Sequence, residues 1–264
     1  HRFMTYCPQG RPVIRLHIFF CAFATVTLAL FGRTLHCAES HRQAPPQFKA
    51  LLNASDIEFD FYDPAIEPDR YPGRALFSLD VRTRFLYEYQ VVRRRARRYV
   101  IIQPKIQKIQ WKLKHTIRLP ESYDDPTMWD TVLLLHELDH VAISSDPRLR
   151  ILLERALFSV KRIERPMTQV GALNEAAIQK IINDEFIKRR DAVVELATKN
   201  YKLLDKVSAH GARNIPNRDA FFRKLYSKES LDEAGFPYLG EVVDLLNDKK
   251  YEKAKLLHHS SIGK

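Results

Sequence analysis

Cysteine is nearly absent from this 264-residue chain, and its three copies, Cys7, Cys21 and Cys37, all fall within residues 1–40. The rest of the chain therefore has no disulfide, no thiol nucleophile and no thiolate that could bind a metal. Glycine is also sparse, at eight residues, and neither a low-complexity segment nor an internal repeat is visible. Any catalysis by this chain must therefore use histidine and carboxylate side chains.

Long apolar runs are absent too, except near the N-terminus, where Ile18–Gly32 carries no charged residue. Arg11 and Arg15 precede this run, and small and polar residues follow it, which is the layout of a secretory signal peptide. The run is shorter than the about 20 residues that a membrane-spanning helix needs. We therefore expect residues 1–40 to be a signal peptide and the protein to be secreted or periplasmic. The alternative is a membrane-anchored protein whose leader is not cleaved.

Acidic residues are fewer than basic ones, 32 against 43, which gives a formal net charge of +11. This excess favours anionic partners such as nucleic acid, anionic lipid or acidic polymers of the cell envelope. The densest basic stretch is RRRARR at residues 93–98, between two predicted strands. A solvated hairpin turn is its simplest explanation, and an anion-binding patch is the functional one. No specific nucleic-acid signature accompanies it.

Alternation of apolar and polar residues dominates the first half of the chain and predicts strands at about 57–61, 77–91, 99–102 and 109–119. Helix signals dominate the second half. Asp-Pro pairs at 125–126 and 146–147 begin two predicted helices, a long helix covers about 168–204, and shorter ones follow at 221–226 and 239–257. Strands first and helices after favour an α+β fold over alternating α/β.

The expected domain organisation follows from these shifts in pattern. Residues 41–56 are polar and contain proline, so we expect a linker there. Residues 57–211 form one domain, a mostly antiparallel twisted sheet followed by helices, and residues 212–264 form a C-terminal helical extension.

The stretch LLLHELDHVAIS at 133–144 carries the pattern His-Glu-x-x-His. On a helix, His136 and His140 lie one turn apart on the same face, so both imidazoles can bind one ion. Glu137 lies about 100° around the helix, where it reaches a water bound to that ion rather than the ion itself. The motif therefore predicts a Zn²⁺ site in which Glu137 is the general base.

A catalytic zinc site usually has a third protein ligand. Asp146 has the spacing of the metzincin ligand, but Ile143 replaces the glycine of that type, and capping of the next helix explains Asp146 better. Glu175 resembles the helix ligand of thermolysin-like enzymes, although Gln179 stands where that type has aspartate. A solvated helix glutamate is the simpler explanation, and Glu175 is kept as the alternative third ligand.

Two histidines are further candidates. His115 lies on the apolar face of a predicted strand, where a hydrogen-bonded core residue is the more common case. His210 follows the end of the long predicted helix, beside Gly211, where a histidine near a helix C-terminus is common without any ligand.

Three features of the chain resemble a family of bacterial secreted zinc-dependent proteases that is otherwise described as a domain of unknown function. They are a β segment that ends in Leu119-Pro120, Trp129 near the start of the motif helix, and the stretch LDKVSAHG at 204–211. The family has Tyr-Asp-x-x-Thr-x-His-Gly at the last of these. Asp205, His210 and Gly211 match that signature, while Ser208 replaces threonine and Leu204 replaces tyrosine.

The resemblance implies that His136, His140 and His210 hold the zinc, with Asp205 orienting His210 or shaping its loop. Tyr201, one turn before Leu204, is a candidate to replace the missing phenol and to donate to the oxyanion. The implied activity is that of a zinc metallopeptidase of zincin-like fold acting on peptide or protein substrates. The alternatives are a zinc amidase that cleaves cell-wall peptides, and a non-enzymatic module that binds anionic envelope polymers and whose motif is structural or degenerate.

One further expectation concerns the substrate. If the strand at 109–119 lies at the edge of the sheet, it can bind an extended peptide by β-addition. Lys112, Lys114 and Arg118 on that strand would then favour acidic substrates.

Overall fold

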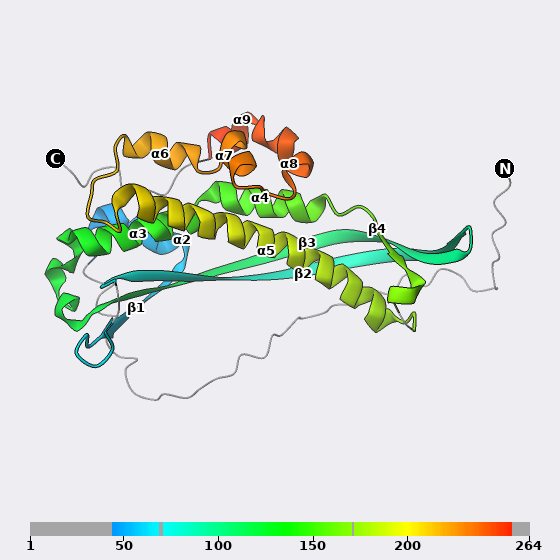
Figure 1. Ribbon diagram of the computed structural model, residues 1–264, viewed down its shortest axis with the longest axis horizontal. Coiled ribbons are helices and arrows are strands. Elements are labelled where there is room, and N and C mark those ends of the chain that lie inside the picture. Colours follow the sequence, from blue (N-terminus) through cyan, green and yellow to red (C-terminus); the bar gives the residue numbers. More distant parts are fainter. Residues whose placement is uncertain (1–43, 69–70, 171, 255–264) are drawn as a thin grey trace.

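The computed structural model describes residues 44–68, 71–170 and 172–254 (Figure 1). The expected signal peptide, residues 1–40, lies outside the described residues. No helix in the described part of the chain is long and apolar enough to cross a membrane.

The fold is α+β, as the order of patterns predicts, and its sheet is mostly antiparallel. β2 (Arg74–Arg94) and β3 (Arg97–Pro120) form one long antiparallel hairpin, with a β-bulge next to Phe85. β1 (Asp56–Tyr62) pairs in parallel with the end of β3, and β4 (Ile163–Pro166) pairs antiparallel with its beginning. The predicted strands at 99–102 and 109–119 are therefore parts of one strand.

Among the described strands, only residues 109–113 of the strand at 109–119 keep an open side, so the condition for β-addition is met for that part alone. β2 pairs with it along one side, and β1 takes the other side from Lys114 onward. Its cations face the acidic residues of β1. The pairs are Lys112 with Asp56, Lys114 with Glu58, and Arg118 with Asp60, at 3.6, 2.7 and 3.4 Å.

Helices α3 (Val132–Ser144), α4 (Pro147–Phe158) and α5 (Glu175–Ser208) cover one face of this sheet (Figure 1). The predicted helix at 126–144 is split, because Pro126–Asp130 is a 3₁₀ turn and Thr131 caps α3. α5 begins at Glu175 rather than near 168, since the Asn174 side chain caps it there by accepting from the Ala177 N–H at 2.9 Å.

The segment expected to be a linker instead belongs to the core. It forms a 3₁₀ turn, Pro46–Phe48, and helix α2 (Lys49–Ala54). Phe48 is fully buried, and its ring centroid lies 5.3 Å from that of Trp129. The composition of the segment is polar, but Phe48 and Leu51 are both buried in the core.

The C-terminal helices are α6 (Arg218–Lys224), α7 (Lys228–Glu233), α8 (Leu239–Leu246) and α9 (Lys249–Glu252). They share the core of the domain rather than forming a separate extension, since Phe222, Tyr226 and Val242 are buried with the residues of α3 and α4. The Tyr226 hydroxyl donates to the Ile143 carbonyl at 2.7 Å, which ties this layer to the end of α3.

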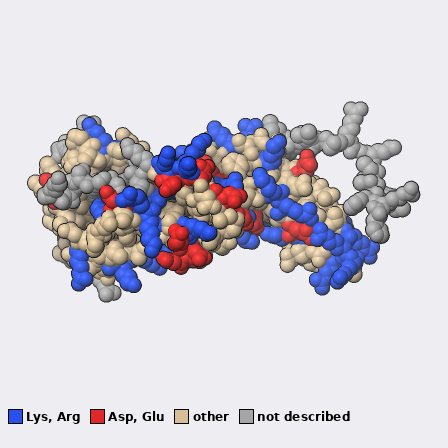
Figure 2. Space-filling model, turned by 90° about the horizontal axis from the view of Figure 1, so that it is seen from above, with Lys and Arg blue, Asp and Glu red and all other residues tan. Residues whose placement is uncertain are grey.

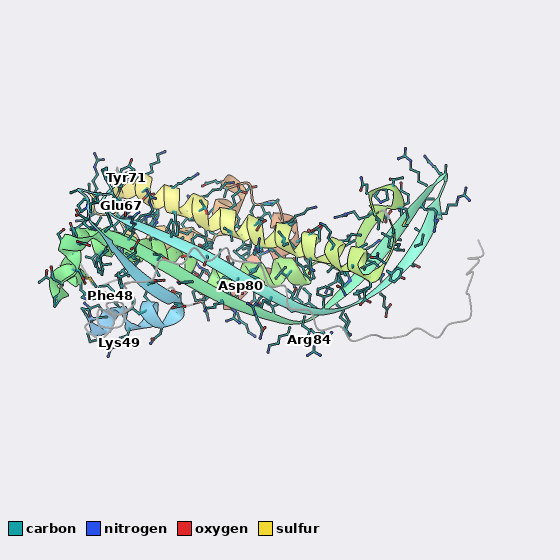
Figure 3. All side chains as sticks on the ribbon, turned by 90° about the horizontal axis from the view of Figure 1, so that it is seen from below. Phe48, Lys49, Glu67, Tyr71, Asp80 and Arg84 are labelled. Carbon is teal, nitrogen blue, oxygen red and sulfur yellow. The ribbon has the colours of Figure 1, made fainter. Side chains whose placement is uncertain are left out.

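The molecule is elongated, and its two ends differ. α3 lies at one end, together with Glu67 and Tyr71 of the β1–β2 connection (Figure 3). The turn of the β2–β3 hairpin lies at the other end. The residues of α3 and those of the β2–β3 turn are therefore far apart.

Candidate metal centre

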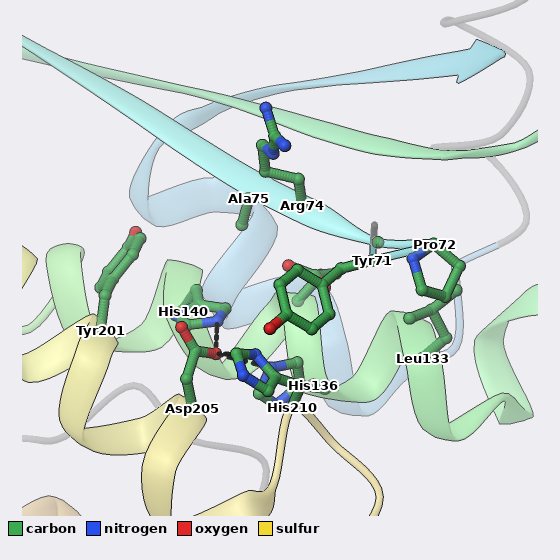
Figure 4. A pocket seen from close by; sticks show the side chains of 12 residues that line it. Tyr71, Pro72, Arg74, Ala75, Leu133, His136, His140, Tyr201, Asp205 and His210 are labelled. Carbon is green, nitrogen blue, oxygen red and sulfur yellow. Dashed lines mark hydrogen bonds and ion pairs between the residues drawn. The ribbon is translucent and has the colours of Figure 1, made fainter. Parts of the chain in front are cut away.

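His136 and His140 lie side by side on the buried face of α3, as their spacing predicts (Figure 4). Their ring centroids are 4.8 Å apart, and each side chain is at most 7% exposed. The two Nε2 atoms converge on one oxygen, Oδ1 of Asp205, at 3.1 and 3.0 Å. Together the three side chains form a group of ligand atoms that could hold a metal ion.

Asp205 comes from α5, which packs against α3. Partial burial opposes ionisation of its carboxyl group. The hydrogen bonds from the two imidazoles outweigh that effect and hold the pKa of Asp205 well below its usual range. Burial acts on His140 as well and lowers its pKa, so the neutral form that can bind a metal is favoured. Asp205 thus lies among the candidate ligand atoms themselves, whereas the resemblance implies that it orients His210 or shapes its loop.

His210 returns to this group through an unusual turn at the end of α5. Ala209 and His210 both have left-handed backbone angles, φ of 49° and 55°, and Gly211 follows with φ of 83°. Non-glycine residues adopt this region at a cost, and such residues concentrate at functional sites. The turn places Nδ1 of His210 3.7 Å from Oδ1 of Asp205, with the imidazole half exposed.

Ser208 connects the turn to the motif helix. Its hydroxyl lies 3.4 Å from Nδ1 of His136 and accepts from the Gly211 N–H at 3.1 Å. Gly211 passes so close to His136 that an added Cβ would come within 3.0 Å of the imidazole. The DKVSAHG stretch is therefore a structural unit in which Asp205, Ser208, His210 and Gly211 each contact the motif or one another.

Glu137 is buried beside the histidines and has an unusual environment. Among the described residues, no partner hydrogen-bonds to Oε2, while the Ala75 backbone amide hydrogen-bonds to the carboxyl group. Burial, and next the negative charge of Asp205, raise the pKa of Glu137 to about 8. A titratable group shifted towards neutrality in a pocket is typical of proton-transfer sites.

Tyr201 does not have the geometry of an oxyanion donor. Its ring packs on His140 at 4.4 Å between centroids, but its hydroxyl lies 2.7 Å from the Ser144 hydroxyl, and burial raises its pKa. Ser144 in turn lies 2.6 Å from Nε2 of His115, whose Nδ1 lies 2.9 Å from the Ser55 hydroxyl. Tyr201 and His115 thus belong to a buried hydrogen-bonded chain that supports His140.

Asp146 and Glu175, the other candidates for the third ligand, lie outside the candidate metal centre. Asp146 caps α4 and binds the Arg148 guanidinium at 2.8 Å, as a capping residue should. Glu175 is the first residue of α5 and Asp205 lies near its other end, so about 45 Å of helix separates them. Glu175 therefore cannot bind the ion that His136 and His140 would hold.

Tyr71, a residue that the sequence analysis did not single out, lines the pocket around the histidines together with Pro72 and Gly73. Its ring stacks on His210, with centroids 4.1 Å apart and an interplanar angle of 21°. Figure 4 shows its hydroxyl pointing into the pocket, towards the histidines. The connection between β1 and β2 has no periodicity, so nothing in its pattern indicated this position.

Comparisons of the chain with family models, with curated proteins and with solved structures found no match. The case for a function therefore depends on the geometry and chemistry of the site.

Proposed function

We propose that this chain is a zinc-dependent hydrolase, and specifically an exported metallopeptidase with a zincin-like fold. One observation carries the proposal: the Nε2 atoms of His136 and His140 converge on a single carboxylate oxygen, beside the buried Glu137. The resemblance of LDKVSAHG to bacterial secreted zinc-dependent proteases points the same way, because that stretch supplies Asp205 and His210.

The residues present fit zinc. Two imidazoles and a carboxylate, with a third imidazole alongside, are the nitrogen and oxygen donors that zinc binds in hydrolases. His136, His140 and Asp205 would hold the ion, and His210 is placed to join them or to take the place of Asp205. Bound zinc would polarise a carbonyl group and lower the pKa of a bound water to about 7.

Glu137 is the residue that moves the proton. Positive charge beside a carboxyl group favours its ionised form, so a loaded site would lower the pKa of Glu137 from the value of about 8 that burial imposes. The carboxylate could then accept a proton from water and return it to the leaving amine. Its protein partner, the Ala75 amide, leaves Oε2 available for that exchange.

Tyr71 replaces Tyr201 as the donor to negative charge that develops on the substrate. Its hydroxyl points into the pocket, and stacking on His210 fixes the ring. The Tyr201 hydroxyl is instead bonded to Ser144. A fixed hydroxyl donor at this place would stabilise the transition state more than the ground state.

The proposal is tested by measuring hydrolysis of a mixed peptide library by wild type and by Glu137→Gln. Wild type should cleave peptides and lose activity with a chelator, and Glu137→Gln should be inactive while it keeps its metal. Glu175→Gln is the matched control, because Glu175 lies at the far end of α5. If the library stays intact while purified cell-wall peptides are cleaved, the zinc amidase alternative replaces the peptidase. Equal activity of Glu137→Gln and wild type would overturn both.

A further inference from the structure

The turn of the β2–β3 hairpin carries five arginines, Arg93, Arg94, Arg95, Arg97 and Arg98, which we call the arginine tip. Figure 2 shows it as the dense group of basic side chains at one end of the molecule. Arg94 binds Glu164 at 2.7 Å. Within residues 44–68, 71–170 and 172–254, no acidic side chain pairs with the other four arginines.

Four arginines of the tip have no acidic partner among the described residues, and this distinguishes the tip from the other end of the hairpin. Near the candidate metal centre, the cations of β3 face the acidic residues of β1, as with Lys114 and Glu58. At the arginine tip the positive charges lie together in water, where they repel one another. Their concentration lowers rather than raises the stability of the hairpin.

The backbone of the turn is also costly. Arg95 has a φ of 54°, a conformation that glycine, asparagine and aspartate adopt far more easily in a two-residue hairpin turn. The Arg95 side chain is exposed, so packing does not explain it. A charged residue in a strained turn that it does not stabilise indicates a function outside the fold.

Exposed apolar side chains adjoin the arginines. Tyr89 and Val91 lie on the same face of β2 as Arg93, and they are 51% and 38% exposed. Arginine beside exposed tyrosine and valine suits the boundary between anionic headgroups and acyl chains. Grooves that bind single-stranded nucleic acid carry a series of stacking aromatics, whereas this tip is a convex end with isolated ones.

We propose that the arginine tip binds the surface of a membrane that contains anionic phospholipid. β2 runs from Ala75 at the candidate metal centre to Arg94 at the tip, about 60 Å at 3.3 Å per residue. A protein bound through the arginine tip would therefore hold the candidate metal centre away from the bilayer and accessible from solvent. This inference does not depend on the proposed hydrolase activity.

Co-sedimentation with vesicles tests it, with phosphatidylcholine alone compared with phosphatidylcholine mixed with phosphatidylglycerol. Wild type should bind the mixed vesicles only, and added salt should weaken binding. Changing Arg93, Arg95, Arg97 and Arg98 to glutamine should weaken it by up to on the order of a thousandfold. The matched control changes four exposed lysines of the C-terminal helices, Lys228, Lys249, Lys250 and Lys253, to glutamine and should bind almost as well.

A second variant, Tyr89→Ser, keeps all charges and should bind mixed vesicles less well than wild type. Circular dichroism of every variant checks that the fold is intact. The proposal is overturned if the arginine and lysine variants bind equally, or if wild type does not co-sediment with mixed vesicles. A preference for an oligonucleotide over mixed vesicles at equal salt would overturn it in favour of nucleic acid.

Discussion

Gly73, the residue just before β2, lies directly against the Glu137 carboxyl group: a Cβ added to the glycine would be 2.5 Å from Oε1 and 2.6 Å from Leu133. At Gly73 the β1–β2 connection thus brings bare backbone against the carboxyl group. Gly73→Ala should displace Glu137 or the start of β2 and reduce hydrolysis by at least tenfold, at a cost of about 1–3 kcal/mol in stability. Zinc content should not change. Normal activity in Gly73→Ala would show that the contact is unimportant for the reaction.

The two tyrosines near the centre should behave differently. Tyr71→Phe removes the hydroxyl that points into the pocket, so we expect kcat to fall by about tenfold to a hundredfold with little change in KM. Tyr201→Phe removes a hydroxyl bonded to Ser144 and should mainly lower stability, by about 1 kcal/mol. Steady-state kinetics and urea unfolding of both variants separate these effects. A larger loss of kcat in Tyr201→Phe would reverse the assignment.

His115 should make the protein sensitive to mild acid. Burial lowers its pKa from 6.5 to about 4. As the pH falls below about 6.5, the unfolded chain therefore binds a proton at His115 while the folded chain stays neutral until about pH 4. The free energy of unfolding should be highest above this window and should fall within it, by at most about 3 kcal/mol from this residue.

Urea unfolding of wild type and His115→Gln across this pH range measures the effect. The variant should be less stable at neutral pH, because two buried hydroxyl contacts change, but its stability should depend less on pH. If the free energy of unfolding falls equally in wild type and His115→Gln as the pH falls, groups other than His115 cause the acid sensitivity.

The C-terminal layer should stabilise the motif helix through Asp139 and Arg218. The Arg218 guanidinium binds both oxygens of Asp139, a carboxylate on α3 between the two motif histidines. Burial raises the pKa of Asp139 to about 7, and the charge of Arg218 acts against that shift. Arg218→Ala would remove that cation and favour the protonated form of Asp139, so we expect the free energy of unfolding to fall by about 1–3 kcal/mol.

Arg190→Ala is the control for that variant, since among the residues that the structure describes Arg190 pairs only with the neighbouring, exposed Asp191, and it should cost less than about 1 kcal/mol. Adding Asp139→Asn to Arg218→Ala should restore part of the stability. Equal effects of Arg218→Ala and Arg190→Ala in urea unfolding would contradict a stabilising role for the pair.

Local periodicity predicted the parts of the fold that depend on neighbours in sequence. The common face of His136 and His140 follows from a spacing of four on a helix, and the alternation at 57–61 predicted β1. The alternation predicted separate strands at 99–102 and 109–119, although the chain continues between them as one strand. The start of α5 was misplaced because capping by Asn174, not the apolar stripe, determines it.

The parts of the fold and of the site that depend on long-range packing were harder to predict from the sequence. A motif gives residue types but no distances. Asp205 was therefore expected to orient a ligand, whereas its carboxylate lies with the candidate ligand atoms of His136 and His140. A long helix was predicted, but only the fold shows that its C-terminal end, with Asp205, lies at the motif and that Glu175 is at the far end. Phe48 and Tyr71 lie in segments without periodicity, and only the folded chain brings them to Trp129 and His210.

The most direct test of the central claim is the zinc content of the purified protein, measured by inductively coupled plasma mass spectrometry. The account predicts about one zinc per chain in wild type and in Glu175→Gln, and almost none in His136→Ala, His140→Ala or Asp205→Ala. Zinc in His210→Ala shows whether that imidazole is required or only adjoins the site. A wild-type protein without stoichiometric zinc, or one that keeps its zinc after loss of both motif histidines, would contradict the claim.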